Sequence, residues 1–98
     1  MKVVWTDRAR RHLRAIHNYI AEDSPRNATR MVDRITRKSE SLARLPLSGH
    51  IVSEYENESV RQVLEGNYRI IRRVKLDYVE VIAVIHGARE LPPLDSVN

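Results

Sequence analysis

The chain has 98 residues and a formal net charge of +4, from 17 basic and 13 acidic side chains. It contains no cysteine, which excludes disulfides, thiolate metal sites and a cysteine nucleophile. Fourteen of the basic residues are arginines, which recognise phosphate and carboxylate bidentately, so a nucleic acid and an acidic protein segment are both candidate partners. No apolar run is long enough for a signal peptide or a spanning helix. We therefore expect one cytoplasmic domain, residues 1–98.

The N-terminal part predicts a short edge strand followed by an amphipathic helix. Residues 2–5 form the apolar strand, and Thr6 then offers an N-cap oxygen. Apolar side chains recur after it with helical spacing, at Ala9, Leu13, Ile16 and Ile20. We expect this helix to end near Asp23.

A second helix is predicted to begin at Ser24-Pro25, because a capping residue precedes a proline at the first helical position. Its apolar stripe continues to Leu45, with Ser39 interrupting it where the helices are expected to approach closely. Pro46 is expected to stop the helix. The linker is so short that the two helices must form an antiparallel hairpin.

The second half of the chain predicts a loop, residues 47–59, and three strands. Residues 60–64 and 68–74 are joined by a tight turn in which Gly66 supplies a positive φ. Residues 78–86 are almost continuously apolar, which indicates a central strand buried on both faces. The order is β-α-α-β-β-β. The expected fold class is α+β, a helical hairpin packed on one face of a small, mainly antiparallel sheet.

The histidines do not form a metal-binding motif. His12 and His17 are five residues apart on different faces of the first helix, and His50 has no ligand-type neighbour at a recognised spacing. His86 closes the last strand and is expected to be structural. There is neither a Walker loop nor a Gly-x-Ser-x-Gly elbow. We expect no metal, no cofactor and no nucleotide hydrolysis.

Arginines on the last strands are the candidate functional residues. Strand alternation places Arg69 and Arg73 on one face of the sheet and Arg72 on the other. One interpretation is that Arg61, Arg69 and Arg89 converge at the open face of the sheet. Because surface charge pairs are common, the favoured alternative is that these arginines pair with Glu65, Glu80 and Glu90.

The order of elements and several segments resemble the ParE/RelE toxin superfamily. The matching segments are Ser24-Pro25, Leu45-Pro46 with Gly49, Gly66-Asn67-Tyr68-Arg69-Ile70-Ile71, and the run from Val79 to Pro92. The last two are specific in combination. The resemblance covers nearly the whole chain, and residues 47–59 are its least diagnostic part. It implies the toxin of a bacterial type II toxin–antitoxin, or plasmid stabilisation, system.

The superfamily has two branches. RelE-like members cut ribosome-bound mRNA with lysines and arginines on the sheet and a tyrosine near the C-terminus, whereas ParE-like members inhibit DNA gyrase. Arg69 and Arg89 match family arginines, and Arg61 lies about where RelE-like members have a lysine. The second lysine position falls near Val63, which is inert, and no tyrosine follows Arg89. This incomplete catalytic set favours the ParE-like branch, and we therefore expect this chain to have no catalytic residues.

A ParE-like chain is expected to act by binding. The resemblance implies a cognate acidic, ParD-like antitoxin in a hetero-oligomer and DNA gyrase as target, with no membrane association and no sequence-specific DNA binding by the chain alone. The residues expected to contact the target are Arg69, Arg89, Glu90, Leu91 and Pro92. One alternative is a RelE-like endoribonuclease using Arg61, Arg69 and Arg89, and another is a non-toxic, antitoxin-binding co-repressor.

The surface available to an antitoxin follows from the thinness of the domain. We expect the core to cover only one face of the sheet well. A partner lying across the rest, as a helix or as an added strand, would cover that surface and stabilise the fold. Pro92-Pro93 cannot continue a strand ladder, so the tail is expected to leave the sheet in an extended form.

Overall fold

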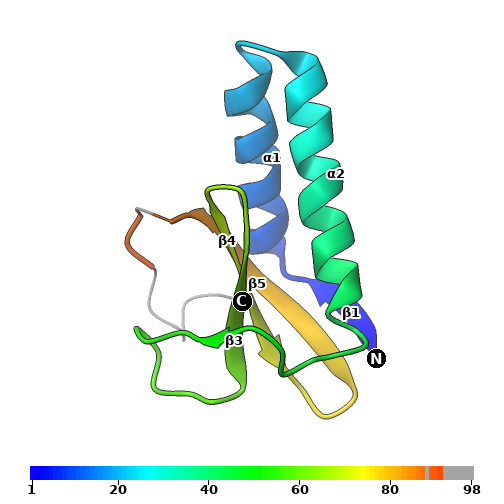
Figure 1. The fold of residues 1–98 in the computed structure, drawn as a ribbon, viewed down its shortest axis with the longest axis vertical. Helices are drawn as coiled ribbons and strands as arrows, with labels where there is room; N and C mark the ends of the chain where they lie inside the picture. The colour runs from blue at the N-terminus through cyan, green and yellow to red at the C-terminus, as the bar shows by residue number, and fades with distance from the viewer. Residues whose placement is uncertain (88, 92–98) are drawn as a thin grey trace.

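The structure, a computed structural model, describes residues 1–87 and 89–91. Two helices form an antiparallel hairpin that packs on one sheet, and the tip of the hairpin projects past the sheet (Figure 1). No helix in the described part of the chain is long and apolar enough to cross a membrane. The elements are β1 (Lys2–Trp5), α1 (Asp7–Ala21), α2 (Pro25–Ser41), β2 (His50–Ile51), β3 (Val60–Glu65), β4 (Tyr68–Val74) and β5 (Tyr78–His86).

The five strands form one sheet in the order β1-β5-β4-β3-β2. β1 is parallel to β5, and the other three pairs are antiparallel, which confirms the mainly antiparallel sheet. β5 lies between β1 and β4, as its apolar run predicts. The pairing of β1 ends at Trp5 with Val81, so β1 covers only the first part of β5.

Local side-chain hydrogen bonds explain where both helices begin. The hydroxyl of Thr6 accepts from the backbone N–H of Ala9 at 3.0 Å, and the hydroxyl of Ser24 accepts from that of Asn27 at 3.2 Å. Such caps satisfy amides that have no partner within the helix, and each contributes about 1 kcal/mol. Pro25 occupies the first turn of α2. Both predicted helix starts are confirmed.

The end of α2 differs from the prediction. The helix ends at Ser41, and the chain continues through three successive i→i−3 hydrogen bonds from the amides of residues 42–44. This tighter winding turns the chain out of the helical seam. Leu42 is therefore still buried, whereas Leu45 is 67% exposed and does not belong to the apolar stripe. The predicted stop at Pro46 comes too late.

Apolar clusters cover both faces of the sheet. The helix face is packed by side chains from α1, α2, β4 and β5, namely Ala9, Ile16, Ile35, Ile70, Val81 and Val84. The opposite face carries a second cluster, namely Val52, Tyr55, Val60, Ile71, Ile82, Ala83 and Ile85. The expectation that only one face is well covered is wrong, because the segment after β2 brings Val52 and Tyr55 across the second face.

The loop predicted at residues 47–59 contains the short strand β2, which pairs with β3 at the edge of the sheet. Both of its residues, His50 and Ile51, are exposed. A strand of two exposed residues has no alternation of buried and exposed positions. It therefore leaves no periodic signal in the sequence.

Candidate functional site

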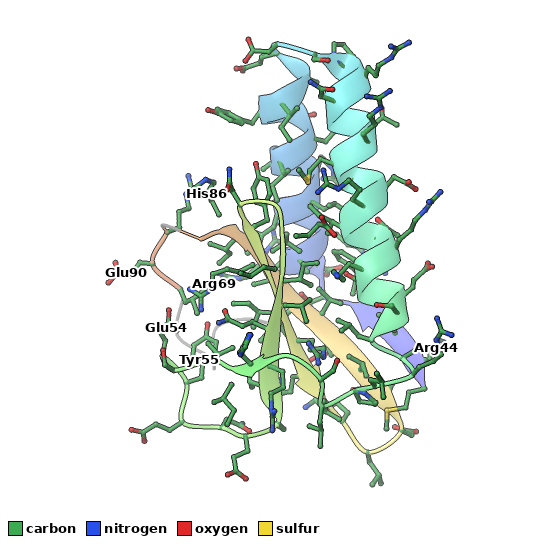
Figure 2. All side chains as sticks on the ribbon, viewed as in Figure 1. Arg44, Glu54, Tyr55, Arg69, His86 and Glu90 are labelled. Atoms are coloured by element: carbon green, nitrogen blue, oxygen red, sulfur yellow. The ribbon has the colours of Figure 1, made fainter. Side chains whose placement is uncertain are left out.

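Arg69 lies on β4, on the face of the sheet opposite the helices, beside Glu54 and Tyr55 (Figure 2). Its Nη1 and Nη2 donate to the two carboxylate oxygens of Glu54 at 2.9 and 3.1 Å, and its Nε donates to Oε1 of Gln62 at 2.6 Å. The side chain is only 11% exposed. The hydrogen bonds from Arg69 hold the pKa of Glu54 below its ordinary value. All three kinds of nitrogen in this guanidinium are therefore engaged within the chain.

The ion pairs differ from those expected from the sequence. Arg69 pairs with Glu54, whereas Glu65 pairs with Arg34 of α2, whose Nη2 lies 2.7 Å from the carboxylate. Glu80 pairs with Arg73, its neighbour across β4 and β5. The expected pairing of Arg61 and Arg69 with Glu65 and Glu80 is therefore wrong: Arg69 does form an ion pair, but with Glu54, a loop residue that was not predicted as a partner.

Arg61 lies on the other face of the sheet. It is in register with Arg72 on β4, which is in turn in register with Val81 in the helix-face cluster. The Nε atom of Arg61 donates to the carbonyl of Glu58 at 3.0 Å, and its Nη1 atom donates to the carbonyl of Leu47 at 3.2 Å. Arg61 therefore fastens backbone segments at this edge of the molecule and lies apart from Arg69.

Arg89 lines a groove of about 940 Å³ beside α1 and the end of β5. Glu90 lines the same groove and is exposed, and Leu91 packs partly against the cluster on the second sheet face. The structure thus brings Arg89, Glu90 and Leu91 together but places Arg61 and Arg69 elsewhere. Pro92 and the rest of the predicted tail lie outside the described residues.

Two residues of α1, Arg8 and His12, line this groove with Arg89. The Nδ1 atom of His12 accepts a hydrogen bond from the backbone N–H of Val84 at 3.2 Å. Burial, followed by the charges of Arg8, Arg11 and Arg89, lowers the pKa of His12, so its ring is neutral at pH 7. Neither Arg8 nor His12 is among the site residues expected from the sequence. The available signal was the unequal length of the expected first and last strands, which leaves part of the last strand uncovered.

Two rings close the end of the groove where β4 meets β5. Tyr68 and His86 are in register across the two strands, and their rings meet edge to face with centroids 5.7 Å apart. The backbone N–H of Gly87 donates to the carbonyl of Asn67 at 2.8 Å, which fixes the chain beyond β5. The groove thus has an aromatic end wall, a basic side from α1 and the 89–91 segment as its outer rim.

Comparison with known proteins places this geometry in a family. The family model described as "ParE toxin of type II toxin-antitoxin system, parDE" matches residues 3–91. The chain belongs to the ParE toxin family. The match spans both helices and all five strands, so the ParE-family resemblance drawn from the last two strands is confirmed.

Individual relatives of this ParE-family chain agree with that assignment. It is 34% identical to "Toxin RelE2" of Caulobacter vibrioides, over 90% of this chain and 97% of the relative. It is also 34% identical to "Putative toxin Y4kP" of Sinorhizobium fredii, over 93% of each chain. A solved structure titled "Chromosomal ParDE TA system from P. aeruginosa" has the same fold, with a TM-score of 0.72 and 24% identity over 88% of this chain and 95% of that one.

Proposed function

We propose that this ParE-family toxin acts by binding and inhibiting an essential target, DNA gyrase, and that a cognate ParD-like antitoxin neutralises it. The observation that supports binding over catalysis is the engagement of Arg69, whose guanidinium holds both oxygens of Glu54. A phosphate of RNA would have to displace this carboxylate to reach the arginine. Nuclease chemistry needs free cationic groups close to the scissile phosphate.

The other residues of the ribonuclease alternative also support binding. Arg61 donates to two backbone carbonyls on the opposite face from Arg69, and Arg89 lines the separate groove beside α1. Val63 packs against the helix-face cluster and offers neither acid nor base. A set of general acid, general base and phosphate-binding groups must lie within hydrogen-bond reach of one substrate. The three arginines do not meet that requirement in this conformation.

The target contact is assigned to the exposed rim formed by Arg89, Glu90 and Leu91. Arg89 and Glu90 are exposed, and Leu91 is half-buried against the second cluster, which anchors the rim to the core. An anchored arginine can form bidentate contacts with an acidic target at a smaller entropic cost than a free one. A role for Arg69 in target binding stays a prediction, and it requires a target carboxylate to replace Glu54.

The test combines growth and target assays. Wild type, Arg89→Ala and Arg44→Ala are induced in a host without antitoxin, and the purified proteins are tested for inhibition of gyrase supercoiling. Arg44 is a matched control, since it is an exposed arginine on the side of the molecule away from Glu90 (Figure 2). We expect Arg89→Ala to lose inhibition by roughly tenfold, the effect of one charge-assisted contact, and Arg44→Ala to keep it.

Primer extension on ribosome-bound mRNA tests the endoribonuclease alternative. Cuts in the ribosomal A site that depend on wild-type toxin would replace this proposal with the ribosome-dependent endoribonuclease. A wild-type chain that neither slows growth nor inhibits supercoiling, yet binds the product of the adjacent gene, would support the non-toxic co-repressor. A melting curve is recorded for each variant in these assays, to establish that the variant is folded.

A further inference from the structure

The positive charge of the chain is concentrated on the helical hairpin. Residues 7–44, which contain α1 and α2, carry ten of the 17 basic and five of the 13 acidic side chains, a net charge of +5. The other residues carry seven basic and eight acidic side chains, a net charge of −1. The hairpin projects at one end of the molecule (Figure 1). Because the rest of the chain is almost neutral, a polyanion is attracted to this end.

Within the hairpin, two rows of arginines lie on the side away from the sheet. α2 buries Ala28, Ile35 and Ser39, and α1 buries Ala9 and Ile16. The exposed side opposite to the buried side carries, at spacings of three and four, Arg11, Arg14 and Asn18 on α1 and Arg26, Arg30, Asp33 and Arg37 on α2. The five arginines of these two rows form the basic face of the hairpin.

The guanidinium groups of this face are little used within the chain. Arg37 pairs with Asp33 at 3.1 Å, and their side chains are 78% and 53% exposed, which makes this a weak surface pair. The other four arginines form no ion pair with residues 1–87 or 89–91. Arg69 and Arg72, by contrast, donate to acceptors of the chain itself. The basic face therefore keeps its N–H donors for a ligand.

The basic face offers charge rather than exposed apolar area. The large apolar side chains that the described part of the chain exposes are Met1, Tyr19, Leu45, Leu47, Ile51, Leu64 and Leu76. Of these only Tyr19 lies on a helix, and it lines the groove beside β5. Leu13 and Val32 are half-buried between the helices. A protein partner needs apolar anchors, and a single nucleic-acid strand needs exposed aromatic rings for stacking. A regular array of phosphates needs neither.

The spacing of the two rows fits the backbones of a B-form duplex. A helix rises by about 1.5 Å per residue, so Arg26 and Arg30 are about 6 Å apart along α2, and Arg26 and Arg37 about 17 Å. Packed helices lie about 8–10 Å apart, and arginines that point outward widen this separation toward the roughly 12 Å major groove of DNA. The major groove of A-form RNA is deep and narrow. The basic face therefore matches duplex DNA better than duplex RNA.

We propose that the basic face binds the phosphate backbone of duplex DNA, with one row of arginines along each strand. The contacts are charge-assisted hydrogen bonds from guanidinium N–H groups to phosphate oxygens. Phosphates carry no sequence information, so binding is independent of base sequence and depends steeply on salt. This interaction goes beyond the proposed function, because it requires neither gyrase nor an antitoxin. With gyrase as target, it would concentrate the toxin on the DNA on which that enzyme acts.

A salt titration tests the proposal on the full chain alone. Binding to a fluorescently labelled duplex of two helical turns is followed by anisotropy. For five phosphate contacts, the logarithm of the association constant is expected to fall with the logarithm of the salt concentration with a slope between about −4 and −5. Duplexes of unrelated sequence are expected to bind equally. Absence of binding at low salt, or a preference of more than about tenfold for one sequence, overturns the proposal.

Two double variants locate the contact. Arg26→Gln/Arg30→Gln removes two charges from the basic face, whereas Arg44→Gln/Lys75→Gln removes two from outside it, after α2 and in the turn between β4 and β5. The first is expected to weaken binding at low salt by roughly tenfold and to reduce the magnitude of the salt slope by about 2, and the second to keep the wild-type slope. Equal losses in both variants would show that only net charge matters, which contradicts a site on the hairpin. Melting curves establish that both are folded.

Replacement of Asp33 tests the same face in the opposite direction. Asp33→Asn removes the carboxylate that pairs with Arg37, so DNA binding is expected to strengthen by roughly threefold. Unchanged or weaker binding contradicts the row along α2.

Competition with other polyanions identifies the class of partner. Polyglutamate and a duplex RNA of the same length are each expected to displace the labelled DNA at least about tenfold less well than unlabelled duplex DNA does. Equally good competition by polyglutamate would make an acidic protein the partner, and equally good competition by duplex RNA would make the ligand an A-form helix. Either result replaces duplex DNA as the ligand of the basic face.

Discussion

Arg72 is the side chain whose environment is least like that of an ordinary arginine. It is fully buried on β4, and its Nε donates to the carbonyl of Pro46 at 2.9 Å. Its Nη2 donates to the carbonyl and, at 3.2 Å, to the hydroxyl of Ser48. Burial, with a smaller contribution from Arg61, lowers the pKa of Arg72 to about 10, so the side chain remains a cation at neutral pH. It ties the segment after α2 to the centre of the sheet.

We expect Arg72→Met to destabilise the chain by about 2 kcal/mol, because it leaves the partly buried carbonyls of Pro46 and Ser48 without their donors. Arg72→Lys keeps the charge but has a single nitrogen in place of the separate Nε and Nη2 donors, and should fall between Arg72→Met and wild type. Urea denaturation followed by circular dichroism measures the change. The exposed Arg44→Met is the control and should stay within about 0.5 kcal/mol. Equal stability of Arg72→Met and wild type would show that the tie contributes nothing.

At the scale of elements, two glycines lie in turns that differ in how strictly they require glycine. Gly49, before β2, has φ 88°, and a Cβ there would lie 2.4 Å from the carbonyl oxygen of Gln62 and 2.9 Å from Cγ1 of Val63. Gly66, in the turn between β3 and β4, has φ 59°, and its Cβ would meet only the flexible end of Met31 at 3.3 Å. Both have the positive φ that favours glycine, but only Gly49 is also pressed against backbone.

Gly49→Ala is therefore expected to cost about 3 kcal/mol, from backbone strain plus the displacement of β3. Gly66→Ala, the matched control, should cost about 1 kcal/mol, because its backbone strain comes with little steric conflict. Thermal melts of both variants give the comparison. If the two variants melt at the same temperature, the close approach of Gly49 to β3 does not limit the substitution.

At the scale of the whole molecule, stability should depend on pH through two groups on opposite faces of the sheet. The pKa of His12 lies below its ordinary 6.5 in the folded chain, mainly through burial, so the unfolded chain takes up this proton first as pH falls. The pKa of Glu54 lies below its ordinary 4.5, mainly through the hydrogen bonds from Arg69, so the unfolded chain again binds the proton first. Both groups therefore reduce stability on acidification.

The free energy of unfolding is expected to fall in two stages, below about pH 6.5 from His12 and below about pH 4.5 from Glu54. His12→Gln keeps an acceptor for the Val84 N–H but does not titrate, so it should remove the first stage only. Arg69→Gln removes the partner of Glu54 and should reduce the second stage. Urea denaturation at intervals from pH 8 to pH 3.5 measures both. A first stage that persists in His12→Gln would assign it to another group.

Much of the fold could be predicted because the relevant signals are local. The caps at Thr6 and Ser24 act within one helical turn of the amides they satisfy. Residues 78–86 reveal a doubly buried strand by composition alone, and the bulge that leaves Ile82 unmatched distributes this apolar run over both faces. The closing run of that strand also carries the resemblance to the ParE toxin family, which residues 3–91 bear out.

Contacts between distant segments depended on the tertiary structure. Glu54 and Arg69 are 15 residues apart, and His12 and Val84 are 72 apart. Neither spacing has a local rule, because which carboxylate reaches an arginine depends on how the intervening loop crosses the sheet. The sequence by itself determined the elements, their order and the family. Only the folded chain decided that Arg69 is occupied, that Arg61 and Arg89 lie apart from it, and that β5 extends beyond β1 into a basic groove. The periodicity of apolar side chains along the sequence indicates which residues are buried. Contacts between residues far apart in the sequence depend on where each helix and strand ends in the folded chain.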